Sequence, residues 1–148
     1  MLIETDDTAL LRLVQDKATR NEGFKFTLHK YSQPIYYFLR KMGLGHEDAD
    51  ELVQDVFVKF WRNPLYEEQN AVLKITLYRL ATKSWMAYNL KHKLAELRGL
   101  TSEQILIIVL KDQEELDFLE IAQITGITVN EVRISFKTGL EKFNQLNN

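Results

Sequence analysis

Side chains able to bind metals or carry out catalysis are few in this sequence and widely spaced. His29, His46 and His92 form no metal-ligand spacing. Cysteine is absent, which excludes disulfides and thiolate metal sites. The sequence contains no glycine-rich phosphate loop and no evident pair of nucleophile and base. We therefore expect a protein that is not an enzyme and that needs no metal or other cofactor.

A different chemistry, the binding of single-stranded nucleic acid, is indicated between residues 69 and 95. This segment contains no acidic residue, and aromatic residues alternate with its lysines and arginine. Basic side chains can follow a phosphate backbone, while rings offer stacking faces to bases. The candidate contacts are Lys74, Tyr78, Arg79, Lys83 and Trp85. The alternative is that Tyr78 and Trp85 are core residues with lysines around them.

Residues 116–133 have the pattern of a helix-turn-helix. Ala122 is small where two helices must cross closely, and Gly126 can adopt the left-handed conformation of a tight turn. Thr128 and Glu131 predict a capping box at the start of the second helix. In such a unit the second helix enters the major groove, and its exposed candidates are Asn130, Arg133, Ser135 and Lys137.

Charge leaves a second interpretation of this unit open. Residues 1–99 carry 15 Lys and Arg against 13 Asp and Glu, whereas residues 100–148 carry 4 against 8. Phosphate neutralisation supplies much of the affinity of proteins for DNA. An acidic C-terminal half therefore also fits a helical hairpin that packs without binding DNA.

The segment from Glu47 to Trp61 is acidic at its start and apolar and aromatic at its end. Acidic residues favour the N-terminus of a helix through the helix dipole. The alternative is that they form a docking face for a basic helix of a partner. The apolar stripe Leu52, Val56, Phe57 and Phe60 is expected to be buried.

The remaining pattern predicts an all-α protein with two domains. Glycines and prolines are few, and no strand-like alternation occurs. Helices are expected at about 8–17, 22–42, 46–61, 70–93, 102–111, 117–125 and 130–145, with Pro34 inside the second. The domains are expected at 1–93 and 100–148, joined by a short linker at 94–99.

Location is predicted from hydropathy. The chain has 148 residues, of which 45% are hydrophobic, as in ordinary globular proteins. Its longest apolar run, Ile105 to Leu110, is too short to span a bilayer, and no signal peptide is evident. We expect a cytoplasmic protein without membrane insertion.

These segments resemble, in their order, the extracytoplasmic-function (ECF) group of bacterial RNA polymerase sigma factors. The most specific match is Asp48 to Trp61. The opening helix of the promoter-melting domain is resembled by Phe24, Tyr31, Pro34 and Tyr36. The resemblance implies a sigma region 2-like domain followed by a region 4-like helix-turn-helix domain. Implied partners are the clamp helices of the largest subunit of core RNA polymerase, promoter DNA and an anti-sigma factor. The implied polymerase contacts are Asp50, Leu52, Gln54, Asp55 and Phe57.

Departures from the family pattern support an alternative function. Thr76 stands where the family usually has Trp, and the loop near 63–69 carries Glu67 and Glu68. The alternative is a sigma-like regulator that binds polymerase or another protein without opening promoters. A plain helix-turn-helix repressor is disfavoured because it leaves the segment from Asp48 to Trp61 unexplained.

The length of the linker limits how far apart the two predicted domains can lie. Six residues from Leu94 to Gly99 reach at most roughly 22 Å. Promoter elements more than one helical turn apart are separated by over roughly 34 Å of duplex. We therefore expect residues 100–148 to pack against the first domain and to bury part of the apolar side of the helix at 70–93.

Overall fold

The computed structural model describes residues 6–62, 72–92 and 99–146. All regular elements in these ranges are helices, which confirms the predicted all-α class. They are α1 (Asp7–Gln15), α2 (Arg20–Lys41), α3 (His46–Arg62), α4 (Leu73–His92), α5 (Ser102–Ile108), η3 (Val109–Gln113), α6 (Phe118–Thr125) and α7 (Val129–Leu146). The predicted helix at 102–111 differs in ending as the π-helical segment η3. No described helix has the length and apolar character needed to cross a membrane.

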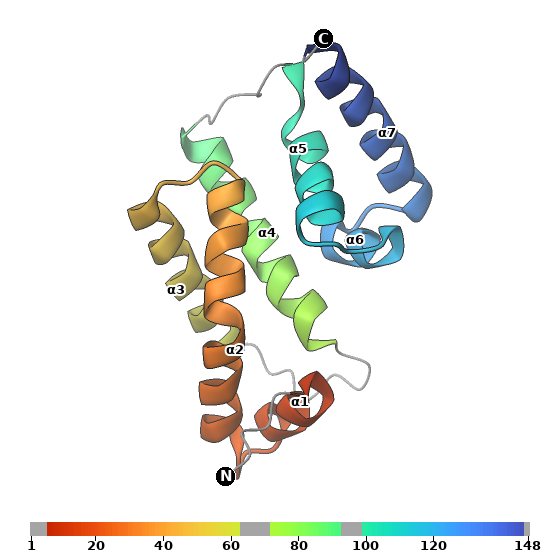
Figure 1. The fold of residues 1–148 in the computed structure, drawn as a ribbon. Helices are drawn as coiled ribbons and strands as arrows, with labels where there is room; N and C mark the ends of the chain where they lie inside the picture. Colours follow the sequence, from red (N-terminus) through yellow and green to blue (C-terminus); the bar gives the residue numbers. More distant parts are fainter. Residues whose placement is uncertain (1–5, 63–71, 93–98, 147–148) are drawn as a thin grey trace.

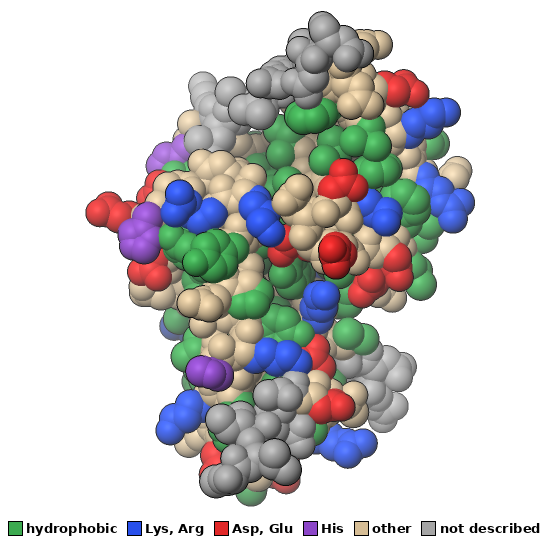
Figure 2. Space-filling model, in the orientation of Figure 1, with side chains coloured by type: hydrophobic (Ala, Val, Ile, Leu, Met, Phe, Trp, Pro, Cys, Tyr) green, Lys and Arg blue, Asp and Glu red, His purple; other side chains and the backbone are tan. Residues whose placement is uncertain are grey.

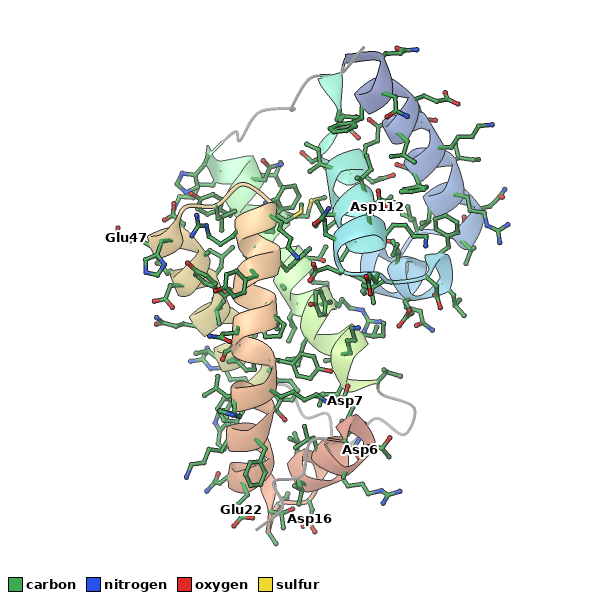
Figure 3. The ribbon with its side chains drawn as sticks, viewed as in Figure 1. Asp6, Asp7, Asp16, Glu22, Glu47 and Asp112 are labelled. Atoms are coloured by element: carbon green, nitrogen blue, oxygen red, sulfur yellow. The ribbon has the colours of Figure 1, made fainter. Side chains whose placement is uncertain are left out.

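The N-terminal half is a bundle of α2, α3 and α4, with α1 packed across one end (Figure 1). α1 begins as expected, because the side chain of Asp6 accepts hydrogen bonds from the backbone N–H groups of Thr8 and Ala9. Figure 3 shows Asp6 and Asp7 together at the start of α1. α1 and α2 approach closely at Gly23 of α2, where an added Cβ would lie 2.7 Å from the backbone nitrogen of Val14 in α1. Only glycine permits this crossing without a shift of the backbone.

The C-terminal half is formed by α5, η3, α6 and α7. Gly126 ends α6 with a φ of +84°, as the turn required. The Glu131 backbone N–H donates to Thr128 Oγ1 at 3.1 Å, and Thr128 N–H donates back to Glu131 Oε1 at 3.4 Å. These bonds confirm the predicted capping box. The buried residues of α6 and α7 include Ile121, Ala122, Ile124 and Val132.

The two halves pack directly against each other through α4 and α6 (Figure 1). Tyr78 OH donates to Glu114 Oε1 at 2.8 Å, and Lys41 Nζ lies 2.8 Å from Glu114 Oε2. Arg79 donates through Nε and Nη2 to the backbone oxygen of Gln123, at 3.1 and 2.9 Å. The arrangement agrees with the compact packing expected from the short linker. Except for Gly99, the linker itself lies outside the described residues.

Candidate functional site

The first predicted surface, on α3, is divided by the fold into an exposed and a buried part. Asp50 and Gln54 are exposed, and Gln54 Nε2 donates to Asp50 Oδ2 at 3.3 Å, one turn away. Leu52 is half-buried. Phe57 is only 3% exposed and packs against Phe24, so little of its ring is accessible to a partner. Of the five predicted polymerase contacts, the structure therefore removes Phe57 from the accessible set.

Asp55 has partners within the protein. Its Oδ2 lies 2.9 Å from Lys59 Nζ and accepts a hydrogen bond of 2.9 Å from Ser84 Oγ on α4. Desolvation alone would raise the pKa of the Asp55 carboxyl. The hydrogen bonds from Lys59 and Ser84, with the charge of Lys59, outweigh desolvation and hold the pKa below its ordinary value. Asp55 thus contributes to the contact between α3 and α4 as well as to the outer surface.

A groove of about 480 Å³ runs between α3 and α4 beside these residues. Tyr88 OH donates to Asp48 Oδ2 across it, and this bond raises the pKa of the Tyr88 phenol. Figure 3 shows Glu47, at the start of α3, pointing away from the bundle. The lining residues are Asp48, Glu51, Leu52, Asp55, Lys59, Ser84, Ala87, Tyr88, Lys91 and His92. The α3 wall is mainly acidic and the α4 wall carries Lys91, so a basic helix would meet its counter-charges on α3.

The second predicted surface, on α4, is changed most by the structure. The rings of Tyr78 and Trp85 are only 3% and 2% exposed. Tyr78 OH is bound to Glu114, and burial together with that carboxylate raises the pKa of the phenol. The indole N–H of Trp85 donates to the backbone oxygen of Met42 at 3.1 Å. The expected stacking role is therefore corrected: in this arrangement both rings are core residues, the alternative that the sequence had left open.

The cations of α4 also lie differently from the expected single track. Lys74 and Lys83 are nine positions apart, which places them on opposite sides of a helix with 3.6 residues per turn. Arg79 and Lys83 lie one turn apart on the same side, where Lys83 is exposed and Arg79 is bound to Gln123. The structure brings together Arg79 and Lys83, and it separates Lys74 from them.

The third predicted surface lies on α7, where three of the four predicted DNA contacts are exposed. Asn130, Arg133 and Lys137 are exposed and recur at the spacing of one helix face, whereas Ser135 is half-buried on another side. Sequence reasoning missed Ile134, which is 60% exposed between them. Its position four residues after Asn130 was the signal that could have identified it. On the face drawn in Figure 2, acidic and basic side chains are interspersed over both halves rather than forming one basic band.

Metal binding finds no support in the described ranges. No group of three or more His, Asp or Glu side chains there is arranged to hold a metal ion.

Comparison with known proteins identifies part of the chain. Residues 27–93 match the family Sigma-70 region 2, a segment that extends from α2 through α4. No curated protein matches the chain. The matched segment includes the acidic start of α3 and the whole of α4, and the segment predicted to be a helix-turn-helix, residues 116–133, lies outside it. The match supports a sigma factor family, with a role in RNA polymerase binding and promoter melting.

Proposed function

We propose that this chain is a sigma factor of the ECF group, which directs core RNA polymerase to promoters from the cytoplasm and has no catalytic activity or cofactor of its own. The observation that carries the proposal is the match of residues 27–93 to Sigma-70 region 2. The exposed polar residues Asp50 and Gln54 on α3 support it, because a basic clamp helix requires accessible acids and amides. An anti-sigma factor that covers the same helix belongs to this proposal as a regulator.

Binding to core polymerase tests the proposal most directly. Asp50→Arg should weaken binding by about 5- to 150-fold, the effect of losing a polar contact worth about 1–3 kcal/mol. Gln54→Ala should weaken it less, because it introduces no repulsive charge. Glu141→Lys reverses an exposed charge on α7 and serves as the matched control. Equal affinity of the wild type and Asp50→Arg, with unchanged helicity by circular dichroism, would contradict the docking assignment.

Asp55 is a poorer probe than Asp50 for this purpose. Its carboxylate accepts the hydrogen bond from Ser84 that joins α3 to α4, so Asp55→Arg would disturb the bundle as well as the surface. A loss of polymerase binding in Asp55→Arg would then have two causes. Asp50 accepts its hydrogen bond from Gln54 on the same helix, so its substitution changes the surface more cleanly.

For DNA, we propose that Arg79 and Lys83 contact the melted strand after α6 has moved away from α4. Phosphate contacts release counterions, so each lost contact should flatten the log–log salt dependence by about 0.7 for a single strand. Arg79→Gln with Lys83→Gln should therefore lower both affinity and slope. Lys74→Gln, on the opposite side of α4, is the matched control and should change neither. An equal change in slope from Lys74→Gln would place the strand elsewhere.

For duplex DNA, we propose that α7 enters the major groove. Asn130, Arg133 and Lys137 supply the polar contacts, and the exposed Ile134 among them suits the methyl group of a thymine. Ile134→Ala should relax preference at one base-pair position while leaving the salt dependence unchanged. Lys137→Gln should instead weaken binding to all sequences. An identical effect of the two changes would contradict these separate roles.

The contact between the two halves, through α4 and α6, favours a second candidate function. This candidate is a sigma-like regulator that binds polymerase without opening promoters. Arg79 is bound to Gln123, and Tyr78 and Trp85 are buried, so α4 offers little to a melted strand in this arrangement. Transcription on a duplex promoter and on a template with a pre-melted bubble distinguishes the candidates. A sigma factor should support transcription on the pre-melted template at least, whereas the regulator should bind polymerase and support neither. A flexible linker inserted after Ala95 tests whether contact between the halves causes the difference.

A further inference from the structure

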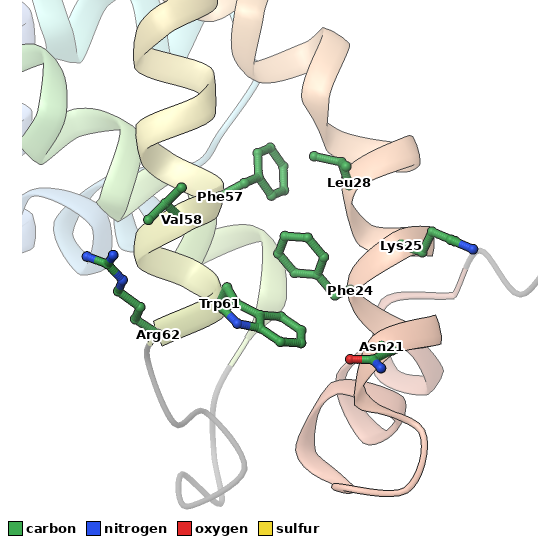
Figure 4. Close-up of a pocket in the computed structure, with 8 residues that line it drawn as sticks. All are labelled: Asn21, Phe24, Lys25, Leu28, Phe57, Val58, Trp61 and Arg62. Atoms are coloured by element: carbon green, nitrogen blue, oxygen red, sulfur yellow. The ribbon is translucent and has the colours of Figure 1, made fainter.

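An apolar groove separate from the three predicted surfaces lies between the N-terminal part of α2 and the C-terminal end of α3 (Figure 4). Its volume is about 580 Å³. Phe24 and Leu28 point into it from α2, and Phe57 and Trp61 point into it from α3. The other lining residues are Asn21, Lys25, Val58 and Arg62.

The floor of this groove is a cluster of packed rings, and its walls are open to solvent. Phe24 packs edge-on against Trp61 at 5.0 Å and against Phe57 at 6.2 Å between ring centroids. Leu28, Val58 and Trp61 are 37%, 46% and 38% exposed. Large apolar side chains that remain exposed together mark an interaction surface more often than isolated ones do. A pocket for a small molecule usually encloses most of its ligand, and a groove this open is better suited to the face of a helix.

The charges at the rim of the groove are positive. Among the described residues, Lys25 and Arg62 are the titratable ones that line it, and no acid does. Arg20 adds a third cation beside it, with its guanidinium 4.4 Å from the centroid of the Trp61 ring. An aromatic floor with cationic edges complements an apolar helix face that is flanked by acidic residues.

We propose that this groove docks a short amphipathic helix of a partner protein, with apolar anchors and acidic flanks. From Asn21 to Leu28 the groove follows α2 for about 10 Å, or two helical turns, which is enough for anchors at positions i, i+3 or i+4, and i+7. Asp50 lies about 12 Å along α3 from Val58 on the groove wall, so Asp50→Arg and changes at the groove rim alter separate parts of the helix. The proposal does not depend on the sigma assignment.

The test uses a labelled helical peptide of about 14 residues, long enough to be partly helical alone. The peptide carries Leu at i, i+3 and i+7 and Glu on both flanks, and its counterpart carries Lys in place of Glu. By fluorescence anisotropy, the acidic peptide should bind the full chain at least about tenfold more tightly than the basic one. Lys25→Glu with Arg62→Glu should reverse this preference. Val58→Asp should abolish binding of both peptides, since it places a charge on the apolar wall.

Lys137→Glu with Lys142→Glu makes the same charge change on α7 and should leave both affinities unchanged. A preference for the acidic peptide that survives the Lys25 and Arg62 reversal would overturn the proposal, as would the absence of binding to the wild type. Concentration-dependent dimerisation that Val58→Asp removes would assign the groove to a second copy of the chain instead. Saturable binding of oleate with no binding of either peptide would assign it to a small apolar anion. The charge-reversed variant keeps its apolar wall, so it remains informative if Val58→Asp fails to fold.

Discussion

α3 and α4 lie side by side in one bundle, yet they leave different parts of their sequences accessible. α3 packs through one stripe, and Asp50 and Gln54 on its other side are exposed. α4 packs on two sides, because α2 and α3 cover one and α6 covers another. Its aromatic residues Tyr78 and Trp85 are consequently buried. Candidate contacts on a helix with one packed face can be predicted from periodicity, whereas those on a helix between two neighbours cannot.

The sequence of α4 explains why its side chains are buried around most of the helix. Leu73, Ile75, Thr76 and Tyr78 are all buried although, at about 100° per residue, they point in different directions around the helix. A helix that is apolar on most of its circumference is buried on most of it. The exposed exceptions among its large apolar residues are Met86, 36% exposed, and Leu90, 80% exposed, both in the C-terminal part of α4. Changes at α4 should therefore cost more stability than changes at α3, except near that end.

The largest effect is expected at Trp85. Trp85→Ala should lower the free energy of unfolding by about 3–5 kcal/mol, because it removes a fully packed ring and leaves a cavity. Trp61→Ala should cost less, since the α3 indole is partly exposed. Leu90→Ala on the same helix as Trp85 is the control and should stay within about 0.5 kcal/mol of the wild type. Urea denaturation measures the free energy of unfolding of all three variants. Equal losses of that free energy in Trp85→Ala and Trp61→Ala would contradict the expected difference between α4 and α3.

A smaller effect is expected at the junction that covers α4. The Glu114 side chain is only 7% exposed and binds both Lys41 and Tyr78 from the first half. Glu114→Ala should cost about 1–3 kcal/mol, because it leaves polar partners without an acceptor. A double-mutant cycle with Tyr78→Phe should give a coupling of about 0.5–3 kcal/mol. Glu141→Ala, at an exposed site, is the control.

The shape of the particle provides an independent check on the same junction. Small-angle scattering of the unmodified protein should show one compact particle, and Glu114→Ala should shift the profile toward an expanded one. An extended particle with two lobes in the wild type would contradict the covered state of α4. In that case the contrast between α3 and α4 would hold for the packing within the bundle alone.

The smallest effect is expected from the pH dependence of Asp55. Because its folded-state pKa lies below the unfolded value of about 3.9, its contribution to stability is complete above that value and is lost as pH falls through the folded pKa. The carboxylate is nearly half exposed, so the contribution should be about 0.2–1 kcal/mol. Asp55→Asn should remove this part of the acid dependence, and Ser84→Ala should remove some of it. Denaturation at a series of pH values measures both, and an unchanged pH profile in Asp55→Asn would show that the bonds to Lys59 and Ser84 add no stability.

Local features of the fold were predictable because short-range interactions determine them. The cap at Asp6, the capping box of Thr128 and Glu131, and the left-handed turn at Gly126 each depend on residues within four positions of one another. The helix boundaries differ from the predicted ones by a few residues, except where η3 ends the helix of α5. Ile134 belonged to the predictable class as well, since its spacing from Asn130 places it on the same face.

The sequence by itself determined which segments are helical, where the turn between α6 and α7 lies, and which residues of α3 carry acidic groups. Only the tertiary structure decided that Tyr78 and Trp85 are core residues, that Arg79 is bound to Gln123, and that an apolar groove remains open beside Trp61. The bonds from Lys41 and Tyr78 to Glu114 join residues 73 and 36 positions apart. Periodicity describes how residues are arranged around one helix, but the exposure of a face depends on which distant segment packs against it, and that follows from the packing of the whole chain.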